Sequence, residues 1–155
     1  MRAFNRREFT LSAAAAAGVA AFPAVDLLAQ DNPQPWQQAL KKIVGDAKPI
    51  DGKVTIEIPE IAENGNTVPI TISVNSPMTD VDHVKAIHII ATANPNAYVA
   101  GFRFTPLSGK ASVSTRIRLA STQEVISVAE LVDGKFLVGR RQVKVTIGGC
   151  GGNTP

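Results

Sequence analysis

A single cysteine, Cys150, is the sixth residue from the end of this 155-residue chain, and two glycines lie on each side of it: Gly148, Gly149, Gly151 and Gly152. Glycine restricts the backbone least, so these residues predict a flexible C-terminal arm. They cannot supply the apolar surroundings in which structural cysteines are usually buried. A thiol presented in this way could hold a covalent cargo and deliver it into a pocket of another protein.

The sequence around Cys150 contains nothing that would activate the thiol. A free thiol has a pKa of about 8.5, so only a few per cent is thiolate at neutral pH. The nearest basic residues, Arg140 and Lys144, lie back along the preceding segment. We therefore expect a non-enzymatic carrier whose cysteine becomes reactive inside a partner. An incidental tail is the alternative interpretation, although an exposed thiol is a liability in an oxidising compartment.

The remaining chemically capable residues do not form a recognisable catalytic or metal site. His83 and His88 are five residues apart, so in a strand they would face opposite sides of the sheet. Asp80 and Asp82 precede that strand and are typical of a turn. Structural or solvated roles are favoured, and no metal site is predicted.

Two arginines, Arg116 and Arg118, alternate with apolar residues and would lie on one face of a strand. We interpret this face as a solvated or partner-facing surface, with anion binding as the alternative. No Ser-His-Asp arrangement, CxxC motif or phosphate-binding glycine loop is present. No cofactor is therefore expected.

The N-terminus has the features of an export signal. Arg6 and Arg7 are followed by Phe9 and by an Ala-rich apolar stretch at residues 11–22. This stretch is shorter than the roughly 20 residues that a membrane-spanning helix needs. The paired arginines and the modest apolar region predict a twin-arginine signal peptide. A short anchoring helix is the alternative.

We place this signal at residues 1–29, with cleavage after Ala29 and Ala24 as the alternative position. A periplasmic location follows, reached by the folded chain together with any bound partner. In that compartment a lone cysteine cannot form an internal disulfide, so reactivity or intermolecular pairing is expected. The net charge is +3, of which +1 belongs to the signal. The remaining +2 is too weak to indicate nucleic acid or a membrane surface.

Residues 30–52 are predicted to form a linker and a short helix. The apolar residues of the segment 36–44 follow helical spacing, and Gly45 is a plausible helix end. The resulting apolar stripe is expected to pack on the domain or on a partner.

Residues 53–147 show the period of two that is typical of strands. Pro69 places part of its strand at an edge or a bulge, and Asp133-Gly134 predicts a two-residue type I′ hairpin turn. We therefore predict an all-β, immunoglobulin-like antiparallel sandwich, followed by the arm at 148–155. The arm would place the cysteine Cα about 10 Å beyond the last strand. The predicted strands are 53–58, 67–74, 84–92, 98–105, 113–119, 124–132 and 135–147.

The C-terminal stretch Lys144–Gly152, the twin-arginine leader and the β-rich domain together resemble the SoxY family, the sulfur-carrier subunits of the thiosulfate-oxidising Sox system. The similarity covers the chain from about Trp36. One departure is the additional Asn153-Thr154-Pro155 after the glycines. Further similar stretches are Pro59–Gly65, Val68–Ile70, Asn75–Met78, Phe104–Pro106 and Thr115–Ala120.

The resemblance implies a heterodimer with a SoxZ subunit and covalent attachment of sulfur intermediates to Cys150. Thiosulfate would be added oxidatively by the SoxAX cytochrome, and the SoxB hydrolase would release the terminal sulfone as sulfate. A sulfur dehydrogenase, where present, would oxidise the remaining sulfur. Two other hypotheses stay open from the residues alone. One is an exported thiol redox or metal-handling protein, which would need a second soft ligand or a resolving cysteine. The other is an interaction module with an inert tail.

Overall fold

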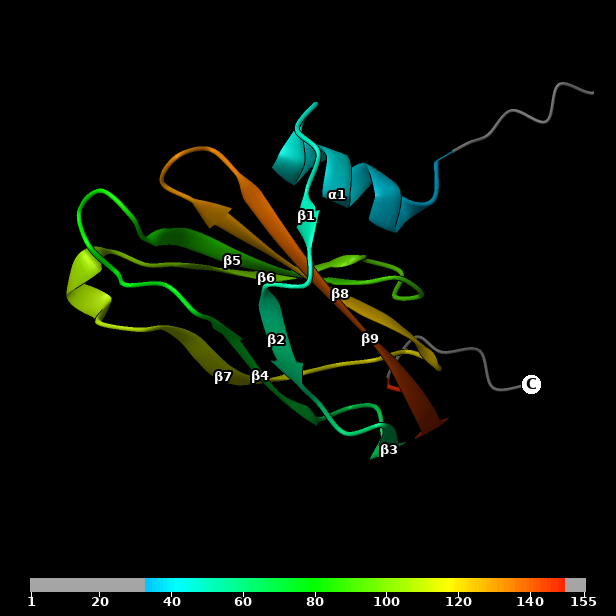
Figure 1. Cartoon of the computed structure of the whole chain (residues 1–155). Helices are drawn as coiled ribbons and strands as arrows, with labels where there is room; N and C mark the ends of the chain where they lie inside the picture. The colour runs from blue at the N-terminus through cyan, green and yellow to red at the C-terminus, as the bar shows by residue number, and fades with distance from the viewer. Residues whose placement is uncertain (1–32, 150–155) are drawn as a thin grey trace, which may run out of the picture. The chain divides into compact units, whose positions relative to one another are not determined.

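Two β-sheets lie face to face in the computed structural model, which describes residues 33–149 (Figure 1). The predicted all-β, immunoglobulin-like sandwich is confirmed. Within residues 33–149 the α-helix α1 has ten residues, and no helix there reaches the roughly 20 apolar residues needed to span a bilayer. The elements are α1 Pro35–Val44, β1 Ile50–Asp51, β2 Val54–Glu57, β3 Ile61–Asn64, β4 Val68–Val74, β5 Val84–Ala91, β6 Tyr98–Arg103, the 3-10 turn η1 Pro106–Ser108, β7 Ala111–Ile117, β8 Gln123–Leu131 and β9 Phe136–Ile147.

The larger sheet has the order β1-β9-β8-β5-β6, and the smaller sheet has the order β2-β4-β7. Strand β5 lies between β8 and β6, and six of its eight residues are buried. This position explains the continuous apolar run in its sequence, because the side chains on both faces of a covered central strand are buried and therefore mostly apolar. Strand β4 is central in the smaller sheet and alternates buried with more exposed residues.

Pro69 lies in a part of β4 that has only one neighbouring strand. It is opposite Arg116 of β7, whereas the pairing with β2 covers only Thr71 to Val74. A proline cannot donate a backbone hydrogen bond, so it is tolerated where the second neighbour is missing. The edge position predicted from the sequence is therefore found.

Two short strands add parallel pairings to an otherwise antiparallel fold. Both β1 and β3 pair with β9, β1 near its beginning and β3 near its end. The β8 pairing of β9 ends at Val143, and β3 then pairs with β9 from Lys144 to Ile147. Strand β1 has only two residues, and the four residues of β3 do not alternate apolar with polar side chains, so periodicity does not reveal either strand. Their effect is to extend β9 as a paired strand up to the C-terminal glycines.

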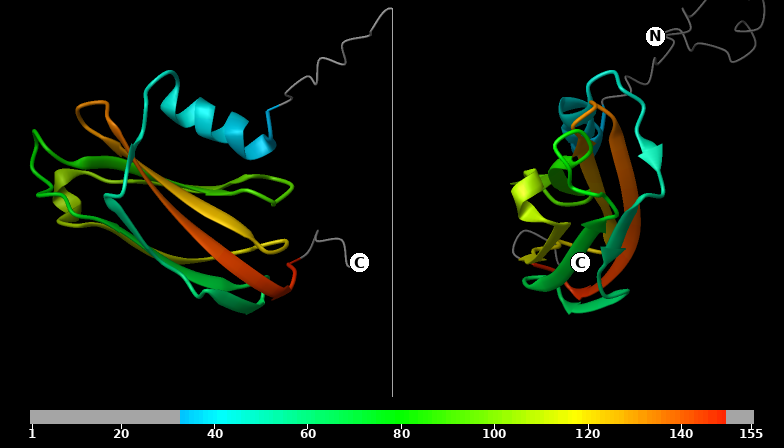
Figure 2. Two further views of the ribbon diagram at one scale, coloured as in Figure 1. Left: turned by 45° about the vertical axis from the view of Figure 1, so that its right-hand side comes forward. Right: turned by 60° about the vertical axis from the view of Figure 1, so that its left-hand side comes forward.

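The main core lies between the sheets and consists of aliphatic side chains, among which Ile72, Ile87, Ile89 and Leu119 are fully buried. Burial of each such side chain contributes about 1.5–3 kcal/mol. A second cluster joins α1 to the outer face of the larger sheet (Figure 2). Its members are Val44, Ile90, Ala97, Ile126, Val128 and Val138, with Trp36, Ala39, Leu40, Ile43 and Phe136 packed against them. The predicted helical stripe is thus docked on the domain.

The hairpin between β8 and β9 differs from the predicted two-residue type I′ turn. That turn needs positive φ at both central residues, but here Gly134 has a φ of +80° while Asp133 does not have a positive φ. The Gly134 N–H bonds the Leu131 carbonyl at 3.1 Å, and the Leu131 N–H bonds the Lys135 carbonyl at 2.9 Å. The connection is therefore a three-residue loop in which glycine takes the left-handed position.

Candidate functional site

The predicted attachment site is described only up to its first two glycines. Gly148 and Gly149 follow β9 and belong to the described residues. Cys150, Gly151 and Gly152 lie outside them, as do Arg6 and Arg7 of the predicted signal. The described part of the site consists of the residues that hold the chain immediately before the cysteine.

Three backbone segments meet at Gly149, and we call Gly65, Leu119 and Gly149 the arm root. Gly65 follows β3, Leu119 follows β7 and Gly149 follows β9. Figure 2 shows the end of β9 in red. The Gly149 N–H donates to the Leu119 carbonyl at 2.9 Å, and the Leu119 N–H donates to the Gly65 carbonyl at 2.8 Å. The Gly65 N–H donates to the Ile147 carbonyl at 2.7 Å. Each segment is thus bonded to both of the others.

The close approach of the backbones leaves no room for a side chain at Gly65 and little room for one at Gly149. A Cβ on Gly65 would penetrate the Leu119 carbonyl oxygen and would lie 2.8 Å from the Gly149 nitrogen. A Cβ on Gly149 would lie 3.0 Å from the Gly65 oxygen and 3.2 Å from the Leu119 oxygen. The predicted arm begins at Gly148, whereas Gly149 is buried and bonded to the domain. The reach estimated from the end of β9 is therefore shorter, while the role of the other glycines as an arm stays a prediction.

Side-chain amides fasten the loops that surround the arm root. The Asn94 Nδ2 donates to the Arg118 carbonyl at 2.9 Å, and its Oδ1 accepts from the Ala120 N–H at 2.9 Å. The buried Gln123 donates to the same Oδ1 at 2.9 Å and accepts from the Ala93 N–H at 2.8 Å. These bonds hold the segment after β5 against the segment after β7.

A pocket of about 250 Å³ opens beside the root between these loops, lined by Asn94, Pro95, Asn96, Arg118, Ala120 and Gly149. The dipeptide Asn64-Gly65 is typical of a turn, and nothing in the sequence pattern points to a role for Asn94 or Gln123. The usable signal was that residues 59–65 and 115–120 both carry the family resemblance. The sequence does not show that these two stretches are in contact. The fold brings Gly65 of the first stretch and Leu119 of the second together at the arm root.

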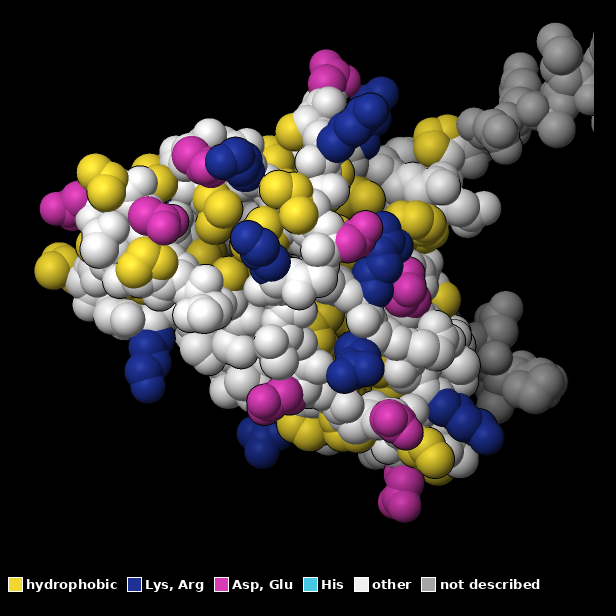
Figure 3. Space-filling view, in the orientation of Figure 1, with side chains coloured by type: hydrophobic (Ala, Val, Ile, Leu, Met, Phe, Trp, Pro, Cys, Tyr) yellow, Lys and Arg dark blue, Asp and Glu magenta, His cyan; other side chains and the backbone are white. Residues whose placement is uncertain are grey.

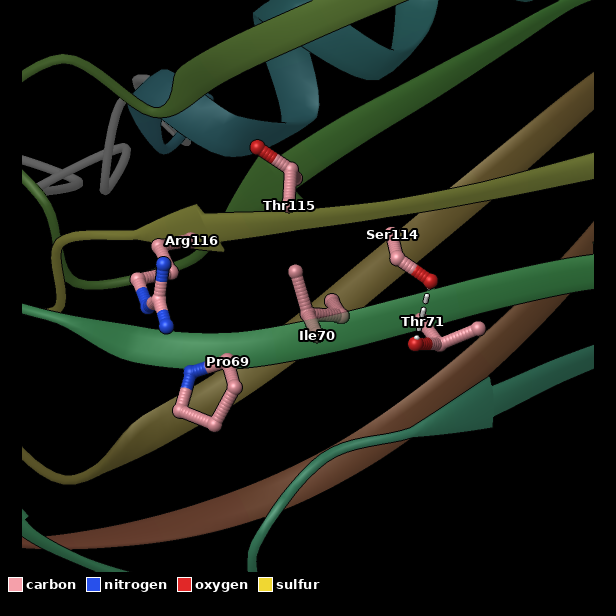
Figure 4. A pocket seen from close by; sticks show the side chains of 6 residues that line it. All are labelled: Pro69, Ile70, Thr71, Ser114, Thr115 and Arg116. Atoms are coloured by element: carbon pink, nitrogen blue, oxygen red, sulfur yellow. Dashed lines mark hydrogen bonds between the residues drawn. The ribbon is translucent and has the colours of Figure 1, made fainter.

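The two arginines lie beside different hollows. Arg118 is exposed one residue beyond β7 and lines the root pocket, and none of the ion pairs within residues 33–149 involves it. Arg116 lies on the exposed face of the smaller sheet beside a shallow pocket of about 520 Å³ (Figure 4). There, the Thr71 and Ser114 hydroxyls are 2.8 Å apart. The solvated-surface and anion-binding interpretations of these arginines both stay predictions. The face of the molecule drawn in Figure 3 carries interspersed charges of both signs.

The two histidines are held by separate structural contacts. The His83 Nδ1 lies 2.9 Å from the Thr79 carbonyl, and the His88 Nδ1 lies 3.2 Å from the Tyr98 hydroxyl. Tyr98 can reach His88 because Gly101 has no side chain in its path. Within residues 33–149, no group of three or more His, Cys, Asp or Glu side chains is arranged to hold a metal ion.

Partial burial lowers the pKa of His88 below its ordinary 6.5, with Glu130 raising it and Arg103 lowering it. Because the neutral ring is favoured in the fold, its contribution to stability is fully present above the unfolded-state pKa of 6.5 and is lost as pH falls through the folded pKa. We expect His88→Gln to reduce the difference in unfolding free energy between about pH 8 and about pH 5. Urea titrations at both values measure this, and an unchanged difference would assign the pH dependence to other groups.

The comparisons with known proteins agree with this architecture. The model of the family described as "Sulfur oxidation protein SoxY" matches residues 40–150. The solved sulfur carrier protein SoxY from Chlorobium limicola f thiosulfatophilum is 34% identical, with a TM-score of 0.60, over 71% of this chain and 94% of that one. No match is found among the curated proteins.

Other solved structures share the fold alone. A superoxide reductase (neelaredoxin) from Ignicoccus hospitalis is 16% identical, with a TM-score of 0.54, over 61% of this chain and 80% of that one. The superoxide reductase from Nanoarchaeum equitans is 12% identical, with a TM-score of 0.53, over 62% and 100% of the two chains. The family match covers well over half of the chain and the similarity to the Chlorobium protein extends over most of it, so the chain belongs to the SoxY family of sulfur oxidation proteins.

Proposed function

We propose that this protein carries sulfur intermediates of thiosulfate oxidation in the periplasm as covalent adducts on Cys150. The observation that carries the proposal is the family match over residues 40–150, which ends on the only cysteine of the chain. The arm root supports it, because it connects the segment that bears the cysteine to a rigid sandwich. The twin-arginine pattern at Arg6 and Arg7 supports the periplasmic location.

Loading joins the Cys150 sulfur to the outer sulfur of thiosulfate. The cysteine thiolate and thiosulfate form one S–S bond, which gives a cysteine S-thiosulfonate and releases two electrons. A SoxAX-type c cytochrome takes up these electrons. The thiolate is the reacting form, and the sequence offers no charged neighbour to stabilise it, so the partner's site provides the activation.

Release regenerates the carrier in steps on other partners. A SoxB-type hydrolase adds water to the terminal sulfone, which cleaves the outer S–S bond and yields sulfate, two protons and a persulfide on Cys150. A sulfur dehydrogenase, where present, oxidises the remaining sulfur before a second hydrolysis. A SoxZ-like subunit forms a heterodimer with the sandwich. The protein contributes the attachment point and its presentation, and the partners contribute the catalysis.

Intact mass spectrometry of the protein from thiosulfate-grown cells tests this function. We expect mass increments that correspond to single sulfur atoms and to thiosulfate, located on Cys150 by peptide mapping and removed by a reducing thiol. The Cys150→Ser variant from the same cells is the control and should show none. A bound metal would favour a metal-handling protein, and glutathione as the only adduct would favour a redox protein; either contradicts the carrier function.

A further inference from the structure

The arm root contains more connections than the end of a strand needs. Strand β9 is already paired with β3 up to Ile147, yet the chain continues for two residues and is bonded again through the Gly149 N–H. The acceptor is the Leu119 carbonyl, and Leu119 is itself fully buried and bonded to Gly65. The chain is therefore held at the last residue before the cysteine.

We propose that Gly65 is a positioning residue for Cys150: it lets Leu119 and Gly149 close on each other, so that the arm pivots after Gly149 and not after Ile147. This inference rests on the proposed carrier function. Gly65 is assigned a role in the backbone of the arm root. It acts by leaving room for two backbone groups, the Leu119 carbonyl and the Gly149 amide, that any side chain would push apart.

The proposed pivot changes what a partner enzyme must do to reach the thiol. From a free end at Ile147, the Cα of Cys150 could travel about 10 Å from the sheet. From a fixed Gly149, the sulfur stays within about 6–7 Å of the Gly149 Cα. A partner pocket must therefore approach the surface around the arm root, including Arg118 and Asn96, which line the pocket beside Gly149. A thiol restricted in this way is presented in a narrower range of directions, which raises the fraction of encounters that are productive.

Amide hydrogen exchange in the full mature chain tests the pivot without any partner. The Gly149 amide should exchange at least about tenfold more slowly than the Gly151 amide, because exchange needs its hydrogen bond to open. Both residues are glycines in the same stretch, so their intrinsic exchange chemistry is closely matched. Equal exchange of Gly149 and Gly151 in the wild-type chain would overturn the proposal.

The second test uses Gly65→Ala with Gly139→Ala as the matched control. A Cβ on Gly139 would lie 2.7 Å from the Val54 carbonyl oxygen, so this variant meets the same kind of backbone obstruction, but between β9 and β2. We expect Gly65→Ala to remove the protection of Gly149 and Gly139→Ala to leave it in place. The comparison separates release of the arm from a general loss of stability.

Loading is then measured in two ways on each variant. Tetrathionate loads a thiol without an enzyme, because the thiolate attacks its central disulfide and releases thiosulfate. We expect Gly65→Ala to change this rate by less than about twofold, since the thiol itself is unaltered. Its kcat/KM in loading by thiosulfate and the cytochrome should fall by at least about fivefold, because presentation is lost. Equal kcat/KM for Gly65→Ala and Gly139→Ala would overturn the positioning role.

Two further measurements cover the cases in which Gly65→Ala does not fold or the wild-type protein is not loaded. If Gly65→Ala does not fold, Gly149→Ala replaces it, since its Cβ contacts of 3.0 and 3.2 Å are tight but less severe. The same loss of kcat/KM with an unchanged tetrathionate rate is expected, and an unchanged kcat/KM contradicts the proposal. If the wild-type protein is not loaded by thiosulfate and the cytochrome, the proposed function fails, whereas the exchange rates of Gly149 and Gly151 still decide where the arm pivots.

Discussion

The Cys150→Ser variant is expected to lose thiosulfate-dependent turnover completely in an assay with the partner enzymes. In the proposed function an S–S bond to Cys150 holds the cargo; a serine hydroxyl cannot form that bond, and the chain has no other cysteine to replace it. Turnover is measured as cytochrome reduction and sulfate release after thiosulfate is added. The expected loss is to the background rate of the assay without the carrier, which is the largest effect that a single substitution can have here.

The same variant should leave the fold and its partner interfaces intact. Cys150 follows the last described residue of the sandwich, and the hydrogen bonds of the arm root join backbone groups of Gly65, Leu119, Ile147 and Gly149. The unfolding free energy should change by less than about 0.5 kcal/mol, as for other substitutions away from packed features. Binding of the partner subunit, measured by calorimetry, should also be retained. Turnover that survives in this variant would show that the cysteine is not the attachment point.

Leu119→Ala is expected to produce the largest loss of stability near the site. The Leu119 side chain is fully buried in the main core, and its backbone forms two of the hydrogen bonds of the arm root. Truncation leaves a cavity in a close-packed interior, which costs about 2–5 kcal/mol. The measurement is the unfolding free energy from urea titration. Alanine keeps the backbone N–H and carbonyl that form the two hydrogen bonds, so the loss of unfolding free energy measures mainly the lost packing of the side chain.

Leu107→Ala is the matched control for this prediction. Leu107 lies in η1 and is 98% exposed, so the same truncation removes almost no buried surface. Its unfolding free energy should stay within about 0.5 kcal/mol of the wild-type value. If both variants lost the same stability, the packing role assigned to Leu119 would be wrong.

The larger strands could be read from the sequence because their pattern is local. The alternation of Val68, Ile70, Ile72 and Val74 reflects one buried face, and the same faces are buried in β4. Strands β1 and β3 could not be found in this way. Their two and four residues acquire strand structure by pairing with β9, which is a contact between distant parts of the chain.

The length of the loop between β8 and β9 also could not be predicted from the local sequence. Asp133-Gly134 correctly indicated a reversal, but the dipeptide is compatible with more than one loop length. The register of Glu130 opposite Phe136 leaves room for more than two residues. The pairing of the strands, together with the left-handed Gly134, selected the three-residue loop.

The sequence by itself determined the chemical identity of the candidate site, which is one cysteine between two glycine pairs after a series of strand-forming segments. The leader stays a prediction from Arg6 and Arg7. These are local properties, because residue type and spacing decide what can react and how freely a backbone can move. Only the tertiary structure decided where the arm is held. Gly65, Leu119 and Gly149 follow three different strands, and their separations in the sequence carry no sign that their backbones meet. That contact depends on β3, β7 and β9 ending at the same place, which is a property of the packed fold.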